Sequence, residues 1–441
     1  MTTIAERLGD WNHDAEGARL HQWVRDLRPM CRSITGDGVR ESLRRLQGIV
    51  ALDLHEVRTG TRVFDWTVPK EWNIRDAFIK NERGERVVDF RANPLHVVSY
   101  SVPVRERMTL AELEPHLFTL AGTPDWIPYR TSYYTPAWGF CLTQRQLDAL
   151  PDGVYDVCID STLEDGHLTY GEHFVRGASD REVLLSMHSC HPGLCNDNLS
   201  GMIVGARLAA LLSEARCRYS YRFLWLPGTI GAITWLALHE GQLSRVNHGL
   251  VLTCVGDDGA FTYKRSRRHH AEIDRVVEHV LRTSGRPHHL VDFTPTGYDE
   301  RQYCSPGIDL PVGCFMRTPN GRFPQYHTSA DDLTLVTPSG LADSLYQLLR
   351  VVQCLEHNRG YVNLQPKCEP QLGTRGLYRA VGGTRSTTTE EALLWVLNYS
   401  DGVHSLLDIA ELSGISLQTL VAAADALTEK ALLAPRSETP A

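Results

Sequence analysis

Residues that bind metals gather in one short stretch of the chain, residues 187–201, which read MHSCHPGLCNDNLSG. His188 and His191 flank Cys190 at the end of an apolar run, and Asp197 precedes a small-residue helix signal. Imidazole nitrogens and carboxylate oxygens are good zinc ligands. Two histidines and an aspartate in front of one helix therefore favour a metal site, in which the neighbouring asparagines could orient the carboxylate by hydrogen bonds.

Cysteine chemistry is the alternative interpretation of the same stretch. Cys190 or Cys195 could be a nucleophile if a histidine activated it, or both thiols could join the histidines around a structural zinc. Neither cysteine lies in a recognisable nucleophile turn, and no second pair of zinc ligands follows. The chain holds 11 cysteines without paired spacing, which indicates reduced thiols in a cytosolic protein.

Two later segments carry further candidates. His327 lies in YHTSADD, where Ser329, Asp331 or Asp332 could also cap a following helix and so fix the loop that presents the histidine. The segment GYDERQYCSPG places an arginine beside two acids and two tyrosines, which suits recognition of a substrate carboxylate or amine as well as a plain surface loop. The expected substrate-binding residues are Tyr298, Arg301, Gln302 and Tyr303.

The elements that must position these residues alternate from about residue 150 to 360. Short apolar runs predict buried strands, and the amphipathic segments between them predict helices, so we expect a mostly parallel sheet covered on both faces. Functional groups in such sheets gather at the carboxyl ends of the strands, and residues 187–201 follow one such end. The expected strands are 155–160, 182–189, 221–227, 248–255 and 310–316, and the expected helices are 199–215, 230–240, 271–285 and 341–358.

Two other regions differ from this α/β pattern. Residues 51–130 alternate apolar and polar positions between turn residues, which predicts a small inserted β-rich domain. Three helical segments with a turn at Gly414 give the outline of a helix-turn-helix or winged helix near the C-terminus. The expected domains are a large α/β domain of residues 1–50 and 131–370, the inserted domain of residues 51–130, and a winged-helix domain of residues 371–441.

Composition and charge narrow the function classes. The chain has 441 residues and a net charge of −8, so neither nucleic acid nor an anionic membrane surface is an expected partner. The N-terminus lacks the basic and apolar regions of a secretory signal, and no apolar run approaches the ~18 residues of a membrane helix. We therefore expect a cytoplasmic protein.

The charge of the winged-helix outline argues against DNA as its ligand. DNA affinity comes largely from Lys and Arg side chains on phosphates. We expect this domain, or the inserted one, to dock or to form a homo-oligomer instead. The charged residues between His404 and Leu433 are Asp408, Glu411, Asp425, Glu429 and Lys430.

Four motifs, HSCHPGLCNDNLSG, PGTIG, YDERQYCSPG and YHTSADD, resemble in sequence and order those of a bacterial aminopeptidase-like family. The resemblance covers nearly the whole chain, since EWNIRDAFI and NPLHVVSYSVPV match the family's inserted domain. Members look like zinc aminopeptidases, and many lie near polysaccharide or natural-product genes. The resemblance implies a three-layer αβα domain with a mostly parallel mixed sheet, a small inserted β-rich domain and a C-terminal winged helix.

The resemblance also carries over part of a metal site. In two-zinc aminopeptidases the first histidine corresponds to His188, the bridging aspartate to Asp197 and the last histidine to His327. Relatives resemble Pro-Glu-Thr-Ile-Gly where this chain reads PGTIG. The paired glutamates of the two-zinc aminopeptidases, one of them the general base, correspond to Gly228 and Thr229, and their later aspartate falls near Thr253.

Loss of these carboxylates changes the expected metal site. Two zinc ions about 3.5–4 Å apart need several carboxylates to offset their charge, so we expect one metal per chain, zinc or iron, with His191 able to replace His188. Its open position would hold water. A general base is typically worth ~10²–10⁴-fold in rate. With Gly228 in place of the glutamate, water or the substrate could serve as base, and the candidate residues are Glu300, Asp299 and His191.

Three functions follow as hypotheses. The first is a mononuclear zinc, aminopeptidase-like hydrolase that cleaves an amide or peptide-like bond of a small metabolite in natural-product or polysaccharide biosynthesis. The second is an acyl-transfer, amide-forming or cyclising enzyme on the same scaffold, by analogy with glutaminyl cyclases. The missing glutamate favours the second, because activation of water depends most on that base. The third is a catalytically dead binding protein.

Overall fold

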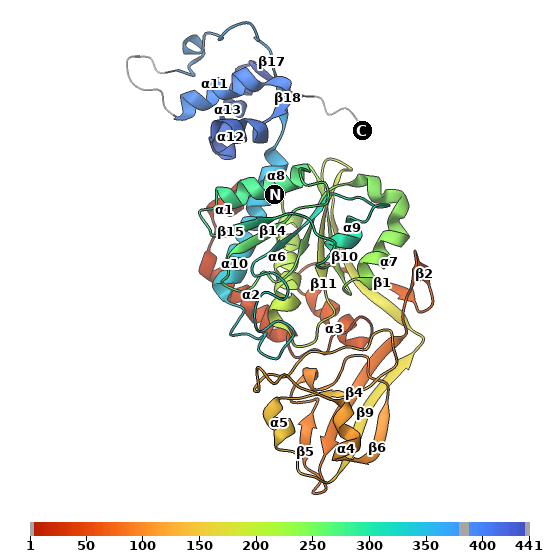
Figure 1. The fold of residues 1–441 in the computed structure, drawn as a ribbon. Helices are drawn as coiled ribbons and strands as arrows, with labels where there is room; N and C mark the ends of the chain where they lie inside the picture. Colours follow the sequence, from red (N-terminus) through yellow and green to blue (C-terminus); the bar gives the residue numbers. More distant parts are fainter. Residues whose placement is uncertain (1–3, 379–387, 437–441) are drawn as a thin grey trace. The chain divides into compact units, whose positions relative to one another are not determined.

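The computed structural model describes residues 4–378 and 388–436 (Figure 1). It divides into two compact units, Met1–Arg275 with Arg286–Leu349, and Val276–Gly285 with Arg350–Ala441. In the part of the chain that is described, no helix combines the length and apolar character that crossing a membrane requires.

An eight-stranded mixed sheet forms the centre of the first unit, in the order β1-β10-β12-β11-β13-β16-β14-β15. Its four middle strands, β12, β11, β13 and β16, are parallel to one another, and every residue of β11 is buried. This confirms the parallel sheet that the apolar runs predicted. The strands are β1 (Asp53–Arg58), β10 (His167–Val175), β11 (Glu182–His188), β12 (Ser220–Leu226), β13 (Val246–Leu252), β14 (Phe261–Lys264), β15 (His288–Val291) and β16 (Val312–Met316).

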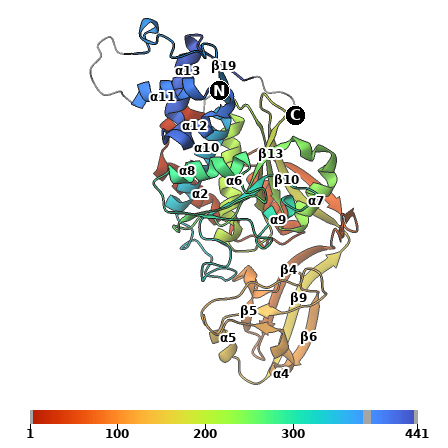
Figure 2. The same ribbon diagram turned by 45° about the horizontal axis from the view of Figure 1, so that its top comes forward.

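Helices flank this sheet, with α2 and α6 on one side and α7 on the other in Figure 2. Helix α6 approaches the sheet closely because it carries glycine at Gly205, where a Cβ would lie 2.6 Å from a side-chain atom of Met187 on β11. This close packing brings the start of α6 to the carboxyl end of β11. The helices are α1 (Ile4–Gly9), α2 (His13–Leu27), α3 (Asp37–Leu46), α6 (Gly201–Ser213), α7 (Ile230–His239), α8 (Glu272–Arg282), α9 (Glu300–Tyr303) and α10 (Pro338–His357).

A separate four-stranded sheet, in the order β5-β4-β9-β6, forms the inserted β-rich domain. Strand β9 was expected in the large sheet, yet it pairs with β4 and β6. Part of β9 stays exposed, which suits a sheet that is not covered on both faces. The chain then passes directly into β10 of the large sheet. The four strands are β4 (Glu71–Lys80), β5 (Arg86–Asp89), β6 (Val104–Thr109) and β9 (Val154–Glu164), and two short helices, α4 (Leu110–Leu113) and α5 (Gln144–Asp148), accompany them.

In the second unit, helices α11, α12 and α13 accompany a small antiparallel sheet in the order β18-β17-β19. Helix α12 starts with a capping box between Ser405 and Asp408, and it ends at Gly414, whose φ of 70° is the left-handed conformation that favours glycine. The turn that the sequence predicted at Gly414 is therefore confirmed. The elements are α11 (Thr388–Tyr399), α12 (Leu406–Ser413), α13 (Leu417–Glu429), β17 (Gly360–Asn363), β18 (Asp401–Ser405) and β19 (Leu433–Pro435).

We predict that this winged-helix unit does not bind duplex DNA with micromolar affinity. The exposed charged side chains of α13 and its C-cap are Asp425, Glu429 and Lys430, a net charge that repels phosphates. Fluorescence anisotropy of a labelled duplex, titrated with the full chain at low and at physiological salt, measures this. Micromolar binding that weakens as salt rises would contradict the prediction.

Candidate metal centre

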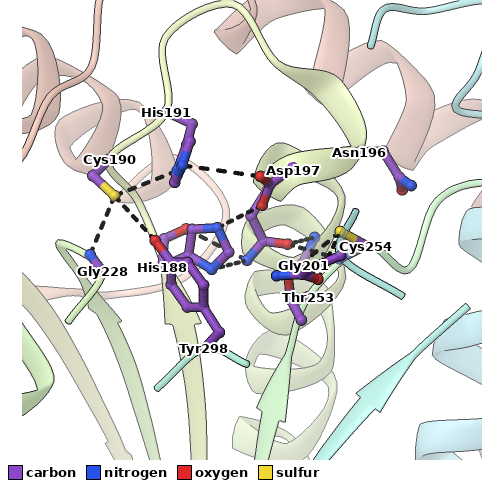
Figure 3. Close-up of polar contacts among 12 residues, drawn as sticks. His188, Cys190, His191, Asn196, Asp197, Gly201, Gly228, Thr253, Cys254 and Tyr298 are labelled. Carbon is purple, nitrogen blue, oxygen red and sulfur yellow. Dashed lines mark hydrogen bonds and ion pairs between the residues drawn. The ribbon is translucent and has the colours of Figure 1, made fainter. Parts of the chain in front are cut away.

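Three imidazoles surround one carboxylate at the carboxyl end of β11. The Nε2 atom of His188 lies 2.8 Å from Asp197 Oδ1, and the Nε2 atom of His327 lies 3.1 Å from Asp197 Oδ2. His191 Nε2 is 3.9 Å from the same Oδ2 atom. Ligand atoms of His188, His191 and Asp197 all lie within 4.8 Å of one another (Figure 3). The structure thus brings together all four residues that the sequence analysis named as possible ligands.

Burial and charge give this cluster the protonation states that a metal requires. The side chains of His188 and Asp197 are 0% exposed, whereas that of His327 is 35% exposed. Burial alone would raise the pKa of Asp197, but hydrogen bonds from His188 and His327 hold it well below its usual range. Burial lowers the pKa of His191 to about 3, so this imidazole is neutral. An ionised carboxylate beside a neutral imidazole is a donor set that fits a divalent ion.

Asp331 holds the loop that carries Asp197. Its carboxylate accepts hydrogen bonds from the backbone N–H groups of Asn196 at 2.6 Å and Asp197 at 2.9 Å. The sequence suggested Ser329, Asp331 or Asp332 as a helix cap, but α10 starts only at Pro338, and Thr337 Oγ1 accepts the N–H of Gly340 there. Asp331 is therefore part of the support of the cluster.

The two asparagines beside Asp197 make contacts other than the expected ones. Asn198 Oδ1 accepts backbone N–H groups from Gly201 and Cys254, and its Nδ2 atom lies 3.3 Å from His188 Nδ1. The Nδ2 group of Asn196 donates to Asp257 Oδ2 at 2.9 Å. Asn198 thus supports the ring of His188, and neither asparagine side chain hydrogen-bonds to the Asp197 carboxylate.

Arg32 is a supporting residue that sequence reasoning missed. Its side chain is buried, and it donates hydrogen bonds to the backbone carbonyls of His191 at 2.9 Å and Leu27 at 2.7 Å. These bonds fix the backbone that presents His191. Arg32 lies 159 residues before His191 in the sequence, so no local motif could have signalled the contact.

A segment of the inserted domain, between strands β6 and β9, builds one wall of the site. The backbone N–H of Tyr129 donates to the carbonyl of His327 at 2.8 Å. The ring of Tyr129 packs edge-on against His327, with centroids 5.1 Å apart, and lies 5.0 Å from the ring of His191. Tyr326 stacks on the ring of His327 at 3.9 Å. His327 has a φ of 56°, a strained conformation that these contacts hold in place.

The structure does not support a cysteine nucleophile. Cys190 Sγ lies 3.4 Å from His191 Nδ1 and 3.4 Å from Tyr298 Oη, and it accepts the N–H of Gly228 at 3.2 Å (Figure 3). Burial nevertheless raises the pKa of this thiol to about 12, so it stays protonated and is a poor nucleophile. The thiol of Cys195 is also buried, and burial raises its pKa as well.

Tyr298 fills the space beside Gly228. A Cβ atom added to Gly228 would lie 1.8 Å from Tyr298 Oη, and the tyrosine ring packs on His188 with centroids 3.8 Å apart (Figure 3). Burial raises the pKa of the Tyr298 hydroxyl well above its usual value, so the group can donate a hydrogen bond but cannot act as a base. The volume that a glutamate at position 228 would need is thus occupied by an aromatic side chain.

The other residues predicted in the 297–307 segment have their partners outside the four-residue cluster. Asp299 is buried and accepts the N–H of Thr229 at 2.8 Å, and burial raises its pKa to about 7. Glu300 is buried in an ion pair with Lys264 at 2.8 Å. Arg301 is exposed, Gln302 lines a cavity with Trp66 and Ile233, and Tyr303 is buried with its hydroxyl 2.9 Å from Ser186 Oγ.

Comparison with known proteins gives the relationship of the whole chain. The family described as "Domain of unknown function (DUF4910)" matches residues 21–358, and a winged helix-turn-helix family matches residues 359–435. The chain belongs to the DUF4910 family. The relatives of the chain confirm its predicted resemblance to an aminopeptidase-like family.

One relative is a Clostridium acetobutylicum protein with an aminopeptidase-like domain, provisionally named for polysaccharide biosynthesis. It is 52% identical over 423 residues, which are 96% of this chain and 97% of the relative. A crystal structure of a provisionally named peptidase from Clostridium acetobutylicum matches with a TM-score of 0.93 and 50% identity over 98% of this chain and 99% of that one. The zinc aminopeptidase BSAP of Bacillus subtilis matches at 12% identity with a TM-score of 0.54, over 76% of this chain and 94% of that one, which shows a shared fold.

We predict that Gly228→Ala destabilises the protein because its Cβ would overlap Tyr298. Overpacking of this kind typically costs about 1–3 kcal/mol of unfolding free energy. The loss should be smaller when Gly228→Ala is added to a Tyr298→Ala background, where the overlapping hydroxyl and ring are gone. Urea denaturation of the four proteins in the cycle measures this coupling.

Gly241→Ala is the matched control for this cycle, because a Cβ at Gly241 meets nothing within 4 Å. It should leave the unfolding free energy unchanged or slightly raised. Additive costs for the two changes at 228 and 298 would show that the overlap does not govern stability.

Proposed function

We propose that this protein is a mononuclear zinc enzyme that acts on an amide or peptide-like bond of a small metabolite, with hydrolysis as the first candidate reaction. The observation that carries this proposal is the buried Asp197 carboxylate in contact with three imidazoles at the end of a central strand. Two relatives support it: the Clostridium acetobutylicum protein has an aminopeptidase-like domain, and a zinc aminopeptidase of Bacillus subtilis shares the fold.

The donor set suits one ion. His188, Asp197 and His327 would hold it, and His191 is the further or replacement ligand. When bound, zinc supplies a Lewis acid that polarises a carbonyl oxygen of the substrate. A second ion would need carboxylates that this chain does not offer on the neighbouring strand ends, where it has Gly228 and Thr253.

The protein side chains around the cluster define where a substrate enters. His327 is the most exposed of the four candidate ligands, so the open face of the site lies on its side. Tyr129 packs against the buried ring of His191 and shields it from water. Such shielding strengthens the electrostatic interaction between the site and a polarised carbonyl.

A non-hydrolytic acyl transfer or cyclisation is the second candidate. The lack of a strong proton acceptor in the site favours it. Tyr298 occupies the space of the usual glutamate and stays protonated. His191 is neutral and adjoins the cluster, but its pKa of about 3 makes it a weak acceptor of a proton from water. A substrate with an amine nucleophile depends less on a general base than water does, because a neutral amine is a stronger nucleophile than neutral water.

We predict that the purified protein contains about one zinc per chain and that Asp197→Ala loses it, because the variant removes the only carboxylate of the donor set. Elemental analysis of protein purified without chelator or metal-affinity resin measures the content. Asp160→Ala, a change at a half-buried carboxylate of the inserted sheet that pairs with Arg75, is the control and should retain the metal. Absence of metal from the parent protein would remove the basis of the proposal.

The two candidate reactions differ in whether oxygen from water enters the product. We predict that a panel of dipeptides and N-acylated amino sugars, incubated in ¹⁸O-labelled water, yields a carboxylate product with one ¹⁸O atom if hydrolysis is the reaction. Asp197→Ala should slow product formation by at least about a hundredfold, since metal polarisation is worth several kcal/mol. Turnover without ¹⁸O incorporation, in the presence of an added amine, would assign acyl transfer instead.

A further inference from the structure

A cavity of about 400 Å³ lies beside the candidate metal centre, between the inserted domain and the large domain. The end of α2 contributes one side of it, and the loop after β5 of the inserted domain contributes another. The residues of its lining that matter here are Arg25, Arg28, Arg91, Pro94, Gly193 and Ser329.

The lining of this cavity carries three arginines and no acidic residue. Arg91 has a carboxylate partner, since its guanidinium lies 2.9 Å from Asp76. Arg25 and Arg28 form no ion pair with any residue that the structure describes. Two positive charges therefore remain uncompensated inside one concave surface, although the chain as a whole has a net charge of −8. A concentration of charge opposite in sign to the rest of the protein indicates an anionic ligand.

The cavity shares its wall with the two loops that carry the candidate metal ligands. Gly193 follows His191 by two residues, and a Cβ on it would lie 3.3 Å from Pro94 of the inserted domain. Ser329 follows His327 by two residues, and its Oγ accepts the N–H of Ile127 at 3.0 Å. An anion in the cavity would thus lie next to the loops that hold the metal site.

We propose that this arginine pocket binds a phosphate group of the substrate, so that the metabolite acted on at the metal centre is a phosphorylated one. The inference rests on the proposed function for the identity of the reacting bond. Guanidinium groups present planar pairs of N–H donors that match phosphate oxygens. A phosphate monoester carries a charge of about −1.5 to −2 near neutral pH, which balances the two free arginines, whereas a carboxylate would leave one of them unbalanced.

The size of the cavity fits this assignment. Small-molecule sites commonly measure about 300–1,000 Å³, so a cavity of about 400 Å³ holds a phosphate together with part of the group that bears it. The phosphate would anchor one end of the substrate on rigid elements, α2 and the loop of the inserted domain. Anchoring of this kind positions the reacting bond and is a source of rate enhancement independent of the base.

Isothermal titration calorimetry with inorganic phosphate tests the proposal on chelator-treated protein at constant ionic strength. The parent protein should bind phosphate at least about tenfold more tightly than acetate, and Arg25→Gln/Arg28→Gln should weaken phosphate binding at least about tenfold, because two charge-assisted contacts are lost. Arg83→Gln/Arg105→Gln removes the same charge from exposed positions of the inserted domain and should bind phosphate as the parent does.

Equal phosphate affinity in the parent and in Arg25→Gln/Arg28→Gln would overturn the proposal, as would acetate that binds as tightly as phosphate or no binding by the parent. The exposed Arg25→Gln change alone, which leaves the buried packing intact, keeps the test valid if the double variant misfolds. Because the titration is done without metal, its result is separate from the zinc analysis. Phosphate binding that needs the arginines, together with an absence of zinc from the purified, untreated parent protein, would support the pocket and reject the metalloenzyme.

Discussion

The structure around the active region depends on one buried negative charge, the carboxylate of Asp197. An ionised carboxylate that is fully removed from water costs several kcal/mol unless charges or hydrogen-bond donors compensate it. Its neighbours are three imidazoles, and burial keeps the ring of His191 neutral. No lysine or arginine among the described residues forms an ion pair with it. The divalent ion that we propose would compensate this carboxylate when bound.

The surrounding elements hold that carboxylate and the neighbouring histidines in position. Strand β11 ends at His188, and the small residues of α6 let the helix start approach the strand closely. Asp331 and Arg32 fix the backbones of Asp197 and His191 from segments distant in the sequence. The inserted domain contributes as well, because a segment between its strands β6 and β9 donates an N–H to the backbone carbonyl of His327. The insertion is therefore a structural part of the site.

Contacts between residues close together in the sequence could be predicted, whereas contacts between distant residues could not. His188, His191 and Asp197 share one stretch of fifteen residues, so their proximity followed from local spacing, and the strand and helix signals around them were strong. The support by Arg32 could not be predicted, since its backbone contact has no sequence pattern. Strand β9 has an apolar run like those of the large sheet, and only its pairing with β4 decides which sheet it joins. Asp331 lies in a segment whose residue types suggest a helix cap, but its carboxylate holds a loop instead. The sequence pattern is the same for both roles.

The resemblance implies a glutamate in relatives at the position of Gly228, and the packing around this glycine favours an altered site over a decayed one. Loss of a glutamate without any compensation would leave a void, and voids in a close-packed interior cost stability. Here Tyr298 fills the volume, its ring packs on His188, and its hydroxyl contacts Cys190, which in turn accepts the N–H of Gly228. Gly228 and Tyr298 are complementary, because any side chain at position 228 would overlap the tyrosine hydroxyl. A site that had only lost its function would have no reason to retain this packing together with an ionised carboxylate and three imidazoles in contact.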